Sequence, residues 1–376
     1  MSRLFTRFTL VLTSVLALLY AYLAWRLTDG LIPRLLLALP FLLIWIVPVR
    51  YWGERREERG AVDDALHVAG YLAMGWLNFV LLLCLARDLL LALSSALPAV
   101  HQPLLQHGPA LVLGGSIAAL LAGFLGARRG PTPVEVQVPV PGLDPALEGF
   151  RIVQISDLHV GPTIGRDYVE RVVRMANALQ PDLVALTGDI VDGPVGGLAD
   201  AVAPLANLQP AGRVFFVAGN HEVYAGLRAW GAQFRSLGIR TLVNEYALLE
   251  QASARLIVGG VSDPTMAAFG EALRPDAARA SGRDEGAAFR LLLSHHPKLA
   301  VDAADAGFDL QLSGHTHGGQ FFPWTLAVRK IHAPHALGLS RRGRMWVYVS
   351  AGSGSWGPPL RLGTKTEVTL LRLVRE

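Results

Sequence analysis

The hydrophobic pattern of the chain changes near Gly130. Before that residue, long runs of Leu, Ala and Val dominate, and after it short apolar runs alternate with helical patterns and turns. Long apolar runs are typical of helices that cross a membrane, whereas short runs bounded by turn residues are typical of strands in a globular domain. We therefore predict two domains, residues 1–130 and residues 131–376.

Four apolar stretches in the first domain approach the length of about 20 residues that a membrane-crossing helix needs. They are Phe8 to Trp25, Leu35 to Val49 with its flanks, Val68 to Ala86, and Gly108 to Ala127. Arg87 and Asp88 interrupt the third run and are expected to end it, with Leu89 to Leu97 as an interfacial or tilted extension. The pattern predicts an α-helical transmembrane region of about four helices.

The arginines near the ends of these runs predict an orientation. One side of the membrane would carry Arg3, Arg7, Arg50, Arg55, Arg56, Arg59, Arg128 and Arg129, and the other would carry Arg26, Arg34 and Arg87. Because positive residues are enriched on the cytoplasmic side, both termini are expected in the cytoplasm. No ionisable residues pair at mid-membrane in this arrangement, so the region is interpreted as an anchor rather than as a transporter.

Composition supports a membrane protein. The 376 residues are 52% hydrophobic, with a mean hydropathy of +0.37, which is too apolar for a fully soluble chain. The net charge of +4 comes largely from arginines that flank apolar runs, so we expect membrane lipids as partners and no nucleic-acid binding. The single cysteine, Cys84, lies in an apolar run, which excludes a disulfide framework and a thiolate metal site.

The second domain alternates strand and helix patterns. Val134 to Pro141 is expected to be a linker or a first edge strand, and a helix is expected near Arg166 to Leu179. Strands are expected at Arg151 to Ser156, Leu183 to Thr187, Val214 to Ala218, Leu256 to Val261, Arg290 to Ser294, Phe308 to Ser313, Trp346 to Ser350 and Glu367 to Leu373. This order predicts an α/β fold with a mixed or doubled sheet.

Polar side chains follow five of these strands. They are Asp157 and His159 after the first, Asp189 after the second, Asn220 and His221 after the third, His295 or His296 after a later strand, and His315 and His317 after the next. Because the carboxyl ends of strands in an α/β sheet meet at an edge where loops converge, we expect these side chains to form one site.

The residue types in this set favour metal chemistry. Asp carboxylates and neutral imidazoles suit Mn²⁺, Fe or Zn²⁺, whereas a site for Mg²⁺ would be mostly oxygen. Two ions about 3.5–4 Å apart can activate a water and clamp both reacting oxygens in a phosphoryl displacement. Each motif alone also fits an ordinary turn, but together and in this order they favour a metal site.

The same residues resemble the motifs of the calcineurin-like metallophosphoesterases. The matching motifs are D-x-H at Asp157 and His159, G-D at Gly188 and Asp189, G-N-H-E from Gly219 to Glu222, and G-H-x-H from Gly314 to His317. The similarity runs from Gly149 to the C-terminus and is greatest to the membrane-anchored bacterial branch typified by YkuE and YaeI. It implies two mixed β-sheets sandwiched by helices.

The resemblance also implies a set of ligands. One metal would be held by Asp157, His159, Asp189 and His317, and the other by Asp189, Asn220, His295 and His315. Asp189 would bridge the ions, and His221 would face the substrate as a catalytic residue. The family pattern of strand, His, any residue, Pro selects His295 over His296. His332 and His335 lie outside the motifs and are expected to be exposed loop residues.

These expectations define a membrane-anchored phosphoesterase. It would hydrolyse a phosphate ester or a pyrophosphate by attack of a hydroxide bound by two divalent metals, most suitably Mn²⁺, at a bacterial inner membrane with the catalytic domain in the cytoplasm. A lipid-linked substrate fits the tether, although no motif in Asp263 to Glu285 or Phe321 to Arg344 identifies it. The alternatives are a non-catalytic metal-binding scaffold or sensor, and a transporter with an accessory hydrolase. The sequence leaves the oligomeric state open.

Overall fold

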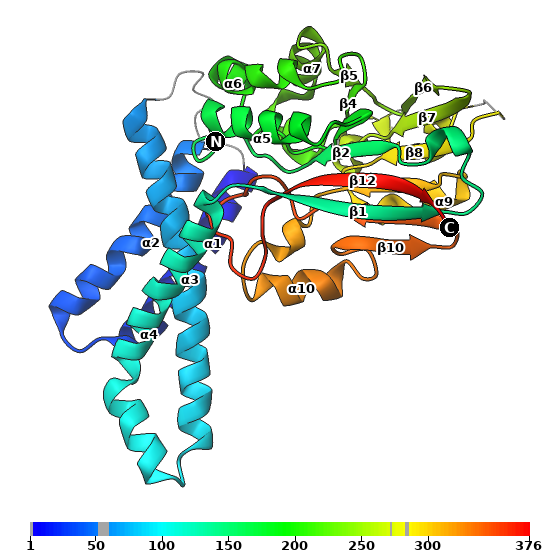
Figure 1. Ribbon diagram of the computed structural model, residues 1–376. Coiled ribbons are helices and arrows are strands. Elements are labelled where there is room, and N and C mark those ends of the chain that lie inside the picture. The colour runs from blue at the N-terminus through cyan, green and yellow to red at the C-terminus, as the bar shows by residue number, and fades with distance from the viewer. Residues whose placement is uncertain (1–2, 52–59, 271–272, 283–285) are drawn as a thin grey trace. The chain divides into compact units, whose positions relative to one another are not determined.

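The computed structural model describes residues 3–51, 60–270, 273–282 and 286–376 (Figure 1). The chain divides into two compact units. One contains residues 1–125 with 357–360, and the other contains residues 126–356 with 361–376. Arg55, Arg56 and Arg59, on which the predicted orientation partly depends, lie outside the described residues, as do the side chains of Arg3 and Arg50.

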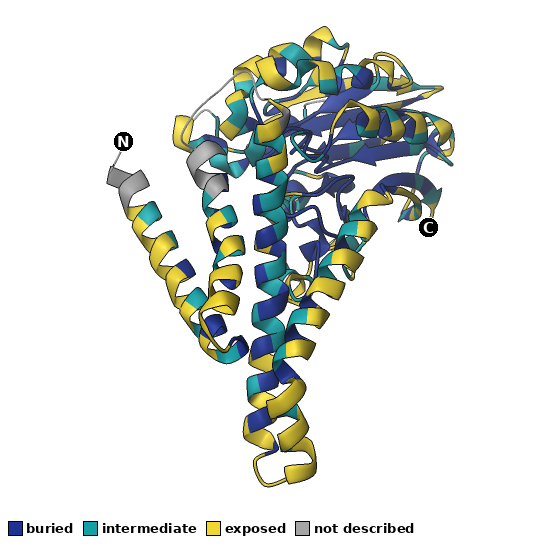
Figure 2. Ribbon diagram, turned by 90° about the vertical axis from the view of Figure 1, so that its left-hand side faces the viewer, coloured by how far each residue is buried: buried dark blue, intermediate teal, exposed yellow. Residues whose placement is uncertain are grey.

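The first unit is helical, as predicted. Its helices are α1 (Arg3–Leu27), α2 (Leu31–Tyr51), α3 (Ala61–Leu93) and α4 (Pro98–Arg128). Within the described residues, three segments are long and apolar enough to cross a membrane: Arg7–Leu27, Val62–Leu93 and Pro98–Arg128. The described apolar part of α2, Leu31–Trp45, is shorter. Much of the surface of these helices is exposed, as a lipid-facing helix requires (Figure 2).

Arg87 and Asp88 do not end the third helix: α3 continues to Leu93, into the segment that was expected as an interfacial or tilted extension. The reason is that Asp88 is paired with another helix. Its carboxylate accepts hydrogen bonds from the Tyr22 hydroxyl at 2.8 Å and from Arg26 Nε at 2.8 and 3.0 Å. The Arg87 guanidinium donates to the Arg26 carbonyl at 3.2 Å. Paired in this way, both charged residues can remain inside an apolar helix.

The second unit is the predicted α/β domain with two mixed sheets. The first sheet has the order β1-β12-β2-β3-β4-β5 and the second has the order β10-β11-β9-β8-β7-β6. The strands are β1 (Thr132–Val140), β2 (Arg151–Ile155), β3 (Leu183–Leu186), β4 (Val214–Phe216), β5 (Arg240–Thr241), β6 (Glu245–Gln251), β7 (Ala254–Gly260), β8 (Phe289–Leu293), β9 (Leu310–Ser313), β10 (Gly338–Arg342), β11 (Met345–Val349) and β12 (Glu367–Arg375). The segment predicted as a linker or edge strand is the edge strand β1, paired in parallel with β12.

Both faces of the sheets are buried. Successive side chains of a strand point to opposite faces, so each strand contributes to two different cores. In β3, Leu183 and Ala185 face the core between the two sheets, whereas Val184 and Leu186 face the helices. In β8, Leu291 and Leu293 likewise face the other sheet. The helices are α5 (Arg166–Ala178), α6 (Val195–Val202), α7 (Asn220–Ser236), α8 (Ala277–Ala280), α9 (Ala300–Asp305) and α10 (Trp324–Ile331).

The helices cover the outer faces of this sandwich (Figure 1). Helices α5 and α7 pack on the first sheet through residues such as Val172 and Trp230, and α8 and α9 pack on the second sheet through Ala280 and Ala303. The sheets are therefore rigid, buried platforms, and the loops at the carboxyl ends of β2, β3, β4, β8 and β9 start from fixed positions.

Candidate metal centre

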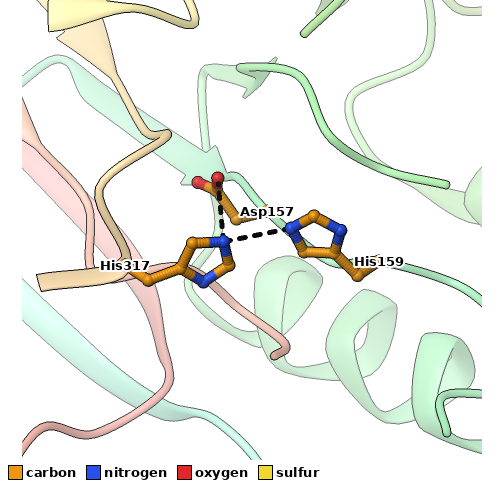
Figure 3. Close-up of side chains that lie close together, drawn as sticks. All are labelled: Asp157, His159 and His317. Carbon is orange, nitrogen blue, oxygen red and sulfur yellow. Dashed lines mark hydrogen bonds and ion pairs between the residues drawn. The ribbon is translucent and has the colours of Figure 1, made fainter. Parts of the chain in front are cut away.

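The structure brings three predicted ligands, Asp157, His159 and His317, into one buried group (Figure 3). His159 Nε2 lies 3.0 Å from His317 Nε2, and His317 Nε2 lies 3.5 Å from Asp157 Oδ1. The two imidazole rings are stacked with their centroids 4.9 Å apart. Two of these residues follow β2 and the third follows β9, so both sheets contribute to the group.

A second group contains Asp189, His295 and His315. His295 Nε2 lies 3.1 Å from Asp189 Oδ2, and His315 Nδ1 lies 3.3 Å from His295 Nε2. The two groups adjoin, because the backbone N–H of His315 donates to Asp157 Oδ1 at 2.9 Å. The bridging role of Asp189 and the assignment of ligands to two ions remain predictions.

The donor atoms of the second group fit a cation. His295 Nδ1 lies 2.8 Å from the Thr187 carbonyl and can only donate to it, which leaves a lone pair on Nε2 facing the Asp189 carboxylate. Two acceptors at 3.1 Å repel each other unless a proton or a metal ion lies at that position. Burial lowers the pKa of His295, but the charge of Asp189 outweighs burial and raises it well above its ordinary value.

Two buried side-chain oxygens also indicate that the site binds a cation. Asp157 Oδ2 and Asn220 Oδ1 are buried and have no hydrogen-bond partner among the residues that the structure describes. Leaving a buried oxygen without a donor costs about 1–3 kcal/mol, and more for a charged group. A divalent cation would satisfy both atoms, so the residues present fit the metal ions that the motifs imply.

Asp192 was missed by the sequence analysis. Its Oδ1 lies 2.6 Å from His159 Nδ1 and 2.7 Å from His221 Nδ1, so one carboxylate orients a predicted ligand and the predicted catalytic histidine. Asp192, His159 and His221 are also close enough to form a third group that could hold an ion. The signal in the sequence was a second Asp three residues after Asp189 in the same loop.

Glu222 holds the loops rather than an ion. It is wholly buried, and its carboxylate accepts four backbone N–H groups: those of Asp189 at 2.9 Å, Ile190 at 2.7 Å, Val191 at 3.1 Å and Gly219 at 2.8 Å. Burial and the nearby charge of Asp189 raise the pKa of Glu222 to about 7, against the backbone N–H groups, which lower it. Because each oxygen accepts two N–H groups, the ionised carboxylate is the form that fits these contacts. Glu222 therefore ties the turn that carries Asp189 to the start of α7.

Arg361 was also missed, and no local motif marks it. Its guanidinium is buried, donates from Nη1 to the His317 carbonyl at 3.1 Å and lies 3.3 Å from His317 Nδ1 through Nη2. Arg361 thus contacts the backbone of His317 and the Nδ1 edge of its ring, whereas Nε2 faces His159 and Asp157.

The backbone at the predicted ligands is unusual. Asp157, His159, Asp189, His315 and His317 all have positive φ, between 51° and 70°. Residues other than glycine seldom adopt this left-handed conformation, and where they do they cluster at functional sites. The neighbouring glycines allow the close packing that results. A Cβ on Gly314 would lie 2.0 Å from Ser156 Oγ and 2.1 Å from Asp157 Oδ2.

The remaining histidines differ in their surroundings. His295 is buried beside Asp189, whereas the Nδ1 of His296 accepts a hydrogen bond from the Lys298 N–H. The expectation that His332 and His335 are exposed loop residues is wrong. Both are half-buried, with the His332 ring 5.9 Å from that of His315 and His335 hydrogen-bonded to Ser340. The sequence missed this because α10 folds back toward the His315 loop.

The electrostatics of the site favour neutral forms of His315 and His317 and a charged His221. Burial and the nearby His295 lower the pKa of His315 to about 2, and burial and His159 hold the pKa of His317 well below its ordinary value. Neutral imidazole is the form that binds a metal. Burial also lowers the pKa of His221, but the bond to Asp192 and the charge of Asp189 outweigh it and raise the pKa to about 9.

Comparisons with known proteins agree with the motifs. The calcineurin-like phosphoesterase family model matches residues 150–319. A transmembrane protein with metallophosphoesterase domain from Danio rerio is 36% identical over 270 residues, covering 69% of this chain and 61% of that protein. A metallophosphoesterase from Aquifex aeolicus is 32% identical, covering 60% of this chain and 85% of that protein. The YkuE metallophosphoesterase of Bacillus subtilis is 31% identical, with 60% and 79% covered.

The chain spans about three fifths of the length of its vertebrate relatives, since the match covers 61% of the Danio rerio protein and 62% of the Bos taurus protein. It spans most of the shorter bacterial ones. The matched region contains the motif residues from Asp157 to His317 that converge at the carboxyl ends of the strands. The chain belongs to the calcineurin-like metallophosphoesterase family.

Proposed function

We propose that this chain is a phosphohydrolase that uses two divalent metal ions and is anchored in a membrane by its helical unit. The observation that carries the proposal is the pair of adjoining Asp–His groups. Two buried oxygens at this edge, Asp157 Oδ2 and Asn220 Oδ1, have no hydrogen-bond partner in the described part of the chain. Such a set leaves uncompensated acceptors unless cations bind. The three apolar helices supply the anchor.

In this proposal Asp157, His159, Asp189 and His317 hold one ion, and Asp189, Asn220, His295 and His315 hold the other. Two divalent cations bound there would activate a water and neutralise charge on the phosphoryl group. The mixture of imidazole and carboxylate ligands favours Mn²⁺, with Fe or Zn²⁺ as alternatives. The ring nitrogens and carboxylates are already oriented by Thr187, Asp192 and backbone N–H groups, so the site is preorganised.

His221 would act on the substrate. Its side chain is only partly exposed, and Asp192 orients the ring through Nδ1, which leaves Nε2 4.0 Å from Asp189 Oδ2. An imidazole at this point can donate a hydrogen bond to a phosphoryl oxygen or a proton to the leaving oxygen. Trp356 lies beside it, with ring centroids 5.8 Å apart, and is half exposed.

The substrate class is a phosphate ester or a pyrophosphate, and the membrane anchor favours one linked to a lipid. The relatives from Danio rerio and Bos taurus are named as transmembrane proteins with a metallophosphoesterase domain. We extend that arrangement to this chain and propose a bacterial inner membrane with the catalytic domain on the cytoplasmic side.

The test is a metal and substrate screen on the full chain in detergent micelles. Metal-stripped protein should be inactive on 4-nitrophenyl phosphate esters and should regain turnover with Mn²⁺. Asp189→Asn should abolish turnover and His221→Ala should reduce it by about 10²–10⁴-fold while metal binding is retained. The matched control is His335→Ala, a half-buried histidine bonded to Ser340. Absence of turnover with every metal and ester would instead support a metal-binding scaffold.

A further inference from the structure

The segment from Phe322 to Leu337, which we call the α10 segment, exposes an unusual amount of apolar surface. The exposed side chains are Phe322 at 42%, Trp324 at 53%, Leu326 at 60%, Ile331 at 67% and Leu337 at 37%. They lie within sixteen consecutive residues, and helix α10 at the centre of the segment has no buried residue. The helices that pack on the sheets are different: α5 buries Val169, Val172, Val173 and Ala176.

A short helix without buried residues has little reason to be stable in water, since most helical stability in proteins comes from packing an apolar face. Trp324 and Ile331 are seven residues apart and lie on the same side of α10. Several exposed apolar side chains gathered in one short segment of a globular domain usually mark an interaction site. The α10 segment therefore leaves much of the surface of these apolar side chains exposed.

The chemistry of the segment fits the surface of a lipid bilayer. It combines Trp, Phe, Leu and Ile with two adjacent exposed cations, Arg329 and Lys330, at the end of the helix. Aromatic residues favour the membrane–water interface, and cations near an apolar surface attract anionic headgroups. Amphipathic helices of this composition lie in the interface with their apolar side chains about 5–10 Å into the headgroup boundary.

The chain also keeps the domain close to a membrane. Helix α4, which is long and apolar enough to cross a bilayer, ends at Arg128, and strand β1 begins at Thr132. Three extended residues reach only about 10 Å. A domain tethered so closely to a span meets the bilayer surface at a high effective concentration.

Both ends of the α10 segment contact the loop that carries His315 and His317. A Cβ on Gly319 would lie 2.4 Å from the Trp324 carbonyl, so the start of α10 packs directly on the backbone two residues after His317. At the other end, the Thr316 hydroxyl donates to the Ala336 carbonyl at 2.8 Å. The apolar surface is thus fixed to the metal centre by short contacts within one domain.

We propose that the α10 segment docks on the lipid surface of the membrane in which the chain is anchored, with Trp324 and Ile331 in the interface and Arg329 and Lys330 at the headgroups. The docked segment holds the metal centre at the bilayer surface, so that phosphoesters of membrane lipids reach it from there. This second statement rests on the proposed phosphohydrolase function, whereas the docking does not.

Spin labels on the full chain in vesicles of phosphatidylcholine and phosphatidylglycerol test the docking. Ile331→Cys carries the label in α10, and Val301→Cys, a 44% exposed position on α9, is the matched control. The native Cys84 is buried, so unmodified protein measures background labelling. We expect the label at position 331 to be more accessible to oxygen than to an aqueous nickel chelate, and the label at position 301 to show the reverse. Equal aqueous access at both positions overturns the docking, as does shielding of position 331 from both reagents, which indicates protein contact.

A pair of substrates tests the access of lipids. Methyl 4-nitrophenyl phosphate and hexadecyl 4-nitrophenyl phosphate share a reacting group and differ in the hydrocarbon tail. We expect Ile331→Asp to lower kcat/KM for the hexadecyl ester in vesicles by about tenfold or more, as loss of one buried aliphatic side chain implies, and to leave the methyl ester unchanged. Val301→Asp should change neither. An equal loss of kcat/KM for both esters contradicts the access of lipids from the bilayer. If the unmodified chain hydrolyses neither ester, the proposed function is contradicted. The spin-label result still decides the docking in that case.

Discussion

Glu222 gives the sharpest test of how the loops of the metal centre are held. Its Oε1 accepts the N–H groups of Ile190 and Val191, and its Oε2 accepts those of Asp189 and Gly219. In Glu222→Gln either orientation of the amide sets an NH₂ group against two N–H donors. Two hydrogen bonds to a charged acceptor are lost, at about 1.5–3 kcal/mol each, so the expected destabilisation is about 3–6 kcal/mol.

The assay is thermal unfolding of the full chain followed by tryptophan fluorescence, since Trp230 is buried in the adjoining core. For a domain of this size about 1 kcal/mol lowers Tm by about 2–4 °C, so Glu222→Gln should melt at least about 6 °C below the unmodified chain. The control is Glu170→Gln, which removes an exposed ion pair with Arg166 and should cost at most about 1 kcal/mol. If the two variants melt within about 2 °C of each other, the four N–H contacts do not stabilise the loops as argued.

Three further changes should have defined effects. Asp192→Asn removes the charge that orients two histidines, so Mn²⁺ affinity measured by calorimetry should fall by about 10–100-fold, and unchanged affinity would exclude this orienting role. Gly314→Ala should impair metal binding, because the added Cβ would lie against the carboxylate of the predicted ligand Asp157. Gly165→Ala is the control, since the space around Gly165 is open, and it should bind metal normally. Equal metal binding by the two variants would contradict the close packing at Gly314. Asp88→Ala leaves Arg26 unpaired in the helical unit and should lower stability by about 3 kcal/mol in a thermal inactivation assay, an effect that is absent if water already solvates the pair.

The sequence predicted those parts of the fold that have a local signal. Helix α5 and strands β2, β3 and β8 lie within about two residues of their predicted bounds, because their apolar runs end at turn residues. Strand β10, with the sequence GLSRR, has no such run and was not predicted. The insertion of β12 between β1 and β2 also has no local signal, because it joins segments more than 200 residues apart.

The residues of the site also divide into those with a local sequence signal and those without one. Motifs located the residues that follow strands, but Arg361 contacts His317 across 44 residues and could only be found once the chain was folded. His332 was assigned to solvent because nothing in its neighbours shows that it approaches His315. Asp192 had a local signal, a short spacing from Asp189, that a longer motif would have included.

The left-handed backbone at the predicted ligands affects how the site is best disabled. Asn and Asp tolerate positive φ better than other residues with a side chain, whereas a left-handed conformation costs an ordinary residue about 1–2 kcal/mol. Alanine at Asp157 or Asp189 would therefore remove a ligand and destabilise its turn at the same time. Asparagine keeps the shape and the conformation and removes only the charge. Inactivating variants of this protein designed with asparagine would separate the loss of a ligand's charge from the loss of folding, whereas alanine substitutions would cause both at once.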